Sequence, residues 1–107
     1  MIRHIVLIRF RKDVPEETIS GLFNDLCSIR DKLPGLLDIQ TGRSESPEKI
    51  ERGFLHGFTA DFANWSDLQA YQEHEDHKRV GAALVAHAEG GIDGILVFDY
   101  VIRGQKS

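Results

Sequence analysis

The chain has 107 residues, of which 41% are hydrophobic and 28% are charged, and its formal net charge at pH 7 is -4. These values predict one globular domain over 1–107 and argue against a disordered or two-domain chain. A net acidic chain without a basic stripe is a poor candidate for nucleic-acid binding, and no run approaches the roughly 18 apolar residues of a membrane span.

The apolar run at the N-terminus is broken by charged residues, so we expect no signal peptide. We therefore expect a soluble, cytoplasmic protein with no nucleic-acid or membrane partner. The single cysteine, Cys27, has no partner for an internal disulfide. Its neighbours resemble an apolar helix face, so we expect a buried, unreactive thiol.

The first predicted element is a strand at 3–11, which carries apolar residues on both of its faces. A helix is predicted from Pro15 to about Leu33, because proline suits the first helical position and acidic residues suit the first turn. Apolar residues recur along it at helical spacing and form one stripe. Proline and glycine at 34–35 end it.

A short strand at 36–42, a loop at 43–52 and a third strand at 53–62 come next. The third strand alternates clearly, with Phe54, His56 and Phe58 on one face. The loop is rich in charged and turn-forming residues, which predicts a solvated, mobile segment. The alternative is a flap over a pocket.

Two helical pieces are then predicted. Ser66 and Gln69 have the spacing of a capping box at the start of the first piece. Asp76 is suited to cap the second, which runs to about residue 88 and ends at two glycines. The last strand, 95–102, is apolar on both faces except for Asp99.

The order β-α-β-β-α-β predicts a ferredoxin-like α+β fold, a four-stranded antiparallel sheet with helices on one face. A half-exposed sheet usually alternates apolar and polar residues, but the first and last strands are apolar on both sides. The uncovered face would be a large apolar patch, which monomers avoid. We therefore expect a homodimer in which two sheets pack face to face.

Six segments, in this order and spacing, resemble the stress-responsive A/B barrel (Dabb) family. The segments are HIVLIRF at 4–10, LPGLLDIQTG at 33–42, SPE at 46–48, GFLHGFTADF at 53–62, YQEHEDH at 71–77 and LVFDY at 96–100. The resemblance covers about 3–101. It implies a small homodimeric α+β barrel, with a cavity between the sheet and the helices of each subunit.

The family includes a plant polyketide cyclase that needs no cofactor, and the resemblance carries its functional groups over by position. They would be His77 as the base, Tyr71 as the tyrosine that assists it, His4 and His56 as pocket histidines, and Asp99 as an acid of the pocket wall. A helix-one tyrosine of the cyclase pocket is replaced here by Leu26, and the proline between the paired histidines by Glu75. These two differences from the cyclase bear on which substrate the chain would accept, more than on its fold.

His74 and His77, three residues apart, allow three interpretations. A metal site would need a third convergent ligand, and neither an HExxH motif nor a second cysteine supplies one, so we expect no metal. A structural joint between two helical pieces would have one ring bonded to a backbone carbonyl. The third possibility is that His77 is a general base, since a neutral imidazole accepts protons near its reference pKa of about 6.5.

Strand alternation places His4, His56 and Asp99 each on an apolar face of its strand. An unpaired buried carboxylate is costly, so we expect a histidine N–H from a neighbouring strand to bond Asp99. Such a polar network would either fix the sheet or orient a ligand.

Two functions remain open. The first is a binding module for a small apolar or aromatic ligand, held in the cavity between sheet and helices. The expected ligand-binding residues are His4, His56, Asp99, Phe23, Leu26, Phe58 and His74. The second is an enzyme that needs no cofactor, a polyketide-cyclase-like lyase, isomerase or monooxygenase in which His77, helped by Tyr71, removes a proton.

Overall fold

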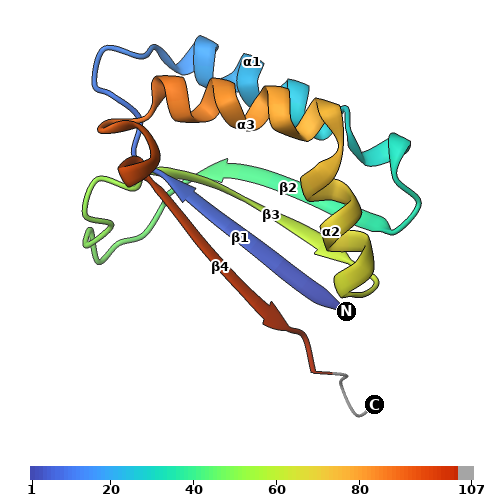
Figure 1. Ribbon diagram of the computed structural model, residues 1–107. Coiled ribbons are helices and arrows are strands. Elements are labelled where there is room, and N and C mark those ends of the chain that lie inside the picture. The colour runs from blue at the N-terminus through green and yellow to red at the C-terminus, as the bar shows by residue number, and fades with distance from the viewer. Residues whose placement is uncertain (104–107) are drawn as a thin grey trace.

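The computed structural model describes residues 1–103 and confirms the ferredoxin-like fold. The strands are β1 (Ile2–Ile8), β2 (Leu36–Arg43), β3 (His56–Phe62) and β4 (Ile95–Val101). The helices are α1 (Glu16–Cys27), α2 (Trp65–Glu73) and α3 (Glu75–His87), with short 3-10 turns at Arg30–Lys32 and Gly91–Gly94. The strands form one antiparallel sheet in the order β2-β3-β1-β4, and the helices lie on one side of it (Figure 1).

The core lies between the sheet and the helices. Along β1, alternate residues from Ile2 to Ile8 are buried against the helices, while Ile5 and Leu7 face the other side. In α1 the buried residues are Ile19, Leu22, Phe23 and Leu26. Their spacing of three and four residues puts them on one face of the helix, as the sequence predicts. No helix among residues 1–103 is both long and apolar enough to cross a bilayer.

The predicted first helix is too long, and the predicted state of its cysteine is wrong. The α-helix ends at Cys27, and only the 3-10 turn Arg30–Lys32 continues toward Leu33. Cys27 is exposed rather than buried. It follows the buried Leu26 by one residue, which is a rotation of about 100° away from the apolar stripe. Partial burial still raises the pKa of the Cys27 thiol.

Both helix caps lie two residues before the predicted positions. Asn64, not Ser66, caps α2, and its side-chain oxygen accepts a hydrogen bond from the backbone N–H of Asp67 at 2.9 Å. His74, not Asp76, caps α3, and its Nδ1 accepts a bond from the N–H of Asp76 at 3.0 Å. Either cap satisfies an amide that the first helical turn leaves free.

The loop between β2 and β3 is longer than predicted, because β3 begins at His56 instead of residue 53. Lys49, Arg52 and Gly53 have positive φ angles of 55°, 58° and 87°, which are incompatible with an extended strand. The backbone N–H of Ser44 bonds the carbonyl of Leu55 at 2.7 Å and closes the loop.

The side of the sheet opposite the helices is bare in the single subunit (Figure 1). We call it the uncovered face, and its apolar residues are Ile5, Leu7, Leu96, Phe98 and Tyr100. The β4 residues on it are strongly exposed, Leu96 by 49% and Phe98 by 59%. The sequence predicts this face, since both strands that form it are apolar on each side.

Candidate functional site

His4 and Asp99 face each other across β1 and β4, on the side of the sheet that bears the helices. Nδ1 of His4 lies 2.6 Å from Oδ1 of Asp99, and the His4 side chain is buried. The carboxylate therefore has the imidazole partner from a neighbouring strand that the sequence predicts. A charge-assisted bond of this kind fixes the ring of His4.

Tyr71, from α2, packs against His4 of this pair and against His77. Its ring centroid lies 4.3 Å from that of His77 and 5.9 Å from that of His4. The Tyr71 side chain is fully buried, which raises its pKa, and its hydroxyl has no hydrogen-bond partner among the described residues. Buried hydroxyls are normally bonded, so this one is an exception that needs a partner. We call His4, Tyr71, His77 and Asp99 the inner cluster.

His77 is held in a defined tautomer. Its Nδ1 lies 3.2 Å from the carbonyl oxygen of Gln72. A carbonyl can only accept, so Nδ1 carries the proton and Nε2 of the neutral ring keeps its lone pair. Burial lowers the pKa of His77, and the bond to Gln72 offsets part of that shift. The ring is therefore neutral, with Nε2 able to accept a proton, near pH 7.

His74 has a different role from His77. Its Nδ1 is used in capping α3, so it joins the two helices. The ring bonded to a backbone carbonyl, which the structural interpretation of the motif predicts, is that of His77 on Gln72. Within residues 1–103, no three His, Cys, Asp or Glu side chains are placed to hold a metal ion.

The structure does not bring His56 to the inner cluster. His56 faces the helices too, but it pairs with Ile8, whereas His4 lies four residues earlier in β1. At about 3.3 Å per residue, that offset is about 13 Å. The ring of His56 packs on Phe10 at 5.4 Å, and its Nε2 lies 3.1 Å from both carboxylate oxygens of Glu16.

The three apolar residues expected around the ligand are part of the core. Phe23, Leu26 and Phe58 are exposed by only 6%, 1% and 5%. Phe23 and His56 nevertheless border a cavity of about 220 Å³ between α1 and the adjoining ends of β2 and β3. Space between sheet and helices thus exists at this end of the sheet, away from the inner cluster.

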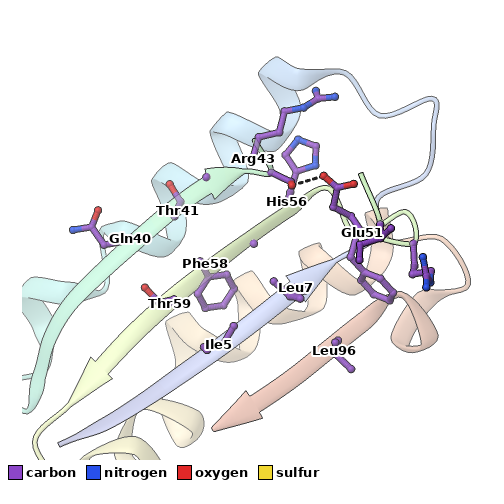
Figure 2. A pocket seen from close by; sticks show the side chains of 16 residues that line it. Ile5, Leu7, Gln40, Thr41, Arg43, Glu51, His56, Phe58, Thr59 and Leu96 are labelled. Carbon is purple, nitrogen blue, oxygen red and sulfur yellow. Dashed lines mark hydrogen bonds between the residues drawn. The ribbon is translucent and has the colours of Figure 1, made fainter. Parts of the chain in front are cut away.

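A larger cavity, of about 640 Å³, lies on the uncovered face (Figure 2). Ile5, Leu7 and Leu96 form its floor, and Ile50 and Phe54 of the long loop border it. The sequence shows that the loop could be a flap over a pocket, but not on which face of the sheet. Only the path of the loop after β2 decides that.

Comparison with known proteins decides the family. A sequence model described as Stress responsive A/B Barrel Domain, Dabb, matches residues 2–102. The chain belongs to the Dabb family. The resemblance seen in the six sequence segments is therefore confirmed over almost the whole of the described chain.

Three relatives show the range of proteins that this Dabb protein is similar to. Olivetolic acid cyclase from Cannabis sativa is 22% identical over 102 residues, which cover 95% of this chain and 97% of the cyclase. A dimeric ferredoxin-like protein of unknown function from Jannaschia sp. CCS1 has a TM-score of 0.88 and 30% identity, with 94% and 98% of the chains covered. Hydroxynitrile lyase from Passiflora edulis has a TM-score of 0.84 at 19% identity, with 99% and 96% covered.

Proposed function

We propose that this Dabb protein is a homodimer that binds a small apolar or aromatic molecule at the inner cluster of each subunit. The observation that carries the proposal is the buried Tyr71 hydroxyl without a partner. Leaving a buried hydroxyl unbonded costs about 1–3 kcal/mol, which a polar atom of a ligand would recover. The ring of Phe62, 5.0 Å from that of Tyr71, offers apolar contact beside it.

Two observations support the homodimer. The uncovered face exposes Leu96, Phe98 and Tyr100 together, and covering apolar area stabilises a complex by about 25 cal/mol per Å². The Jannaschia relative, with 30% identity, is a dimeric ferredoxin-like protein. A second copy of this chain is therefore the proposed partner of this face.

Ligand binding is tested with olivetolic acid, an aromatic acid with an apolar alkyl chain, followed by NMR of the backbone amides. We expect the amides around Tyr71 and His77 to shift and saturate. Tyr71→Phe should weaken binding about fivefold, the worth of one neutral hydrogen bond. Tyr100→Phe makes the same chemical change at the chain's other tyrosine and should leave the affinity unchanged.

Shifts confined to residues far from Tyr71 and His77 would place the ligand elsewhere and contradict the proposal. Equal affinities of the wild type and Tyr71→Phe would show that the hydroxyl does not contact the ligand.

A second candidate function, cofactor-independent proton transfer, is favoured by the tautomer of His77. With Nδ1 bonded to the Gln72 carbonyl, Nε2 is left as the base. Mandelonitrile is a suitable probe, since it joins an apolar ring to the hydroxynitrile group that the Passiflora relative is named for. His77 would remove the hydroxyl proton as the carbon–cyanide bond breaks, which yields benzaldehyde and a cyanide ion that takes up the proton.

The enzymatic hypothesis is tested by the rate of benzaldehyde formation. His77→Ala should lower kcat/KM about 10²–10⁴-fold, the worth of a positioned base. His87→Ala, at the far end of α3, is the matched control and should leave the rate unchanged. A wild-type rate no faster than buffer alone, or a His77→Ala variant with full activity, would contradict the lyase form of the hypothesis.

A further inference from the structure

A separate cavity of about 210 Å³ lies at the end of the sheet where β1 leaves it and α1 begins. Its charged and polar lining residues are Arg9, Arg11, Lys12, Glu16, Arg43, His56 and Glu89. This is well above the roughly 10–15 Å³ that one water needs, so the cavity has room for a small ion or the head of a small molecule. We call it the basic cavity.

The basic cavity concentrates positive charge in a chain whose net charge is negative. Four of its lining residues are lysine or arginine, and only two are acidic. Of the acids, Glu16 is already bonded by Arg43 at 2.6 Å and by His56 at 3.1 Å. Figure 2 shows Arg43 and His56 next to each other at this end of the sheet. The hydrogen bond from His56, followed by the nearby charges, lowers the pKa of Glu16, so this carboxylate is charged and satisfied.

Arg11 is bonded to the Asp13 carboxylate and to the carbonyl of Ala86, whereas Arg9 is less well satisfied. Nε of Arg9 is buried without a hydrogen-bond partner among the described residues, and the nearest carboxylate oxygen, on Glu89, is 3.6 Å away. Lys12 lines the same cavity and is exposed, so its charge is available to a ligand. A buried guanidinium N–H without a partner is unfavourable, and an oxyanion is its strongest acceptor.

The side chain of Arg9 is also held in place by its neighbours, which prepares it to bind an anion. Its guanidinium lies over the ring of Phe54 at 5.0 Å. Its side chain packs so closely under Gly53 that a Cβ there would lie 2.8 Å from Cδ of Arg9. Gly53 has a φ of 87°, so a side chain at this position would be strained as well. An arginine fixed in advance loses less entropy when it binds an anion.

We propose that the basic cavity binds a small oxyanion, a phosphate or carboxylate group, through Arg9 and Lys12. The site is independent of the inner cluster, because Arg9 and Lys12 follow the last residue of β1, whereas His4 is the third residue of that strand. Either function can therefore be tested and lost without the other.

The test is a titration of the full chain with inorganic phosphate at low ionic strength, followed by NMR of the backbone amides. We expect saturable shifts around residues 9–12 and 53–56. Arg9→Met and Lys12→Met should each weaken binding about tenfold, because each removes a charge-assisted hydrogen bond. Lys78→Met removes the same charge from an exposed position outside the basic cavity and should leave the affinity unchanged.

A linear response without saturation, or equal weakening by all three variants, would overturn the proposal, since either shows only general charge attraction. If a variant fails to fold, the wild-type titration decides: saturable shifts that lie outside the basic cavity overturn the proposal. A parallel titration with malonate separates the two chemistries. Tighter binding of phosphate supports a phosphate ligand, and tighter binding of malonate supports a carboxylate.

Discussion

Nδ1 of His4 lies 2.6 Å from Oδ1 of Asp99, although 95 residues separate the two in the chain. The bond joins the central strand β1 to the edge strand β4, which has no other strand beside it. It also sets the ring of His4 against Tyr71, the residue with the unsatisfied hydroxyl. One contact therefore links the edge of the sheet to the inner cluster.

Removing the carboxylate of this pair should destabilise the protein. Asp99→Ala leaves the buried Nδ1 of His4 without a partner, which we expect to lower the free energy of unfolding by about 1–3 kcal/mol. Urea denaturation measures the change. Asp93→Ala, in the exposed turn before β4, is the control and should have little effect. Equal losses in the two variants would show that the His4–Asp99 bond adds nothing to stability.

Removing the Tyr71 hydroxyl should stabilise the ligand-free protein. Tyr71→Phe deletes a buried polar group that has no described partner, so we expect the free energy of unfolding to rise by up to about 1 kcal/mol. Thermal and urea denaturation of the ligand-free protein check this. A loss of more than about 1 kcal/mol would mean that a bound water or a protein group satisfies the hydroxyl.

Stability should depend on pH through His77. Burial lowers the pKa of His77 below the value of about 6.5 in the unfolded chain, so between the two values the unfolded state binds more protons. Its contribution to stability is therefore complete above about pH 6.5 and is lost as the pH falls through the folded-state value. His77→Gln should flatten the dependence in this window, measured by urea denaturation at several pH values. An unchanged slope would rule out His77 as its source.

Sequence patterns predicted the layers of the fold and a histidine partner from a neighbouring strand for Asp99, because alternation and the cost of a buried carboxylate are both local arguments. The register of β1 and β4 makes His4 that partner. They could not place His56, since alternation gives the face of a residue but not the register between strands. His56 pairs with Ile8, not with the part of β1 near His4.

The helix starts were missed for a related reason. Several residues near each start could serve as a cap. The backbone is extended at Asn64 and at His74 and becomes helical after them, which makes these two residues the caps. The cavity on the uncovered face had no clear signal in the sequence either, because it depends on how the loop after β2 folds back.

The uncovered face should hold two subunits together. Phe98→Asp would bury an unpaired carboxylate in that interface, which costs several kcal/mol, so we expect a monomer near the chain mass of 12.1 kDa. The wild type should sediment at twice that mass. Ile92→Asp is the control, since Ile92 is 67% exposed but lies outside the sheet. A monomeric wild type, or two dimeric variants, would contradict this interface.

The most direct test of the proposed binding function is a crystal structure of the protein with olivetolic acid. The inner cluster and the cavity on the uncovered face lie on opposite sides of the sheet, so the position of the ligand separates the two sites. We expect a polar atom of the ligand within hydrogen-bond distance of the Tyr71 hydroxyl and the ring of His77. A ligand bound only between Leu7, Leu96 and Phe54 would contradict the account.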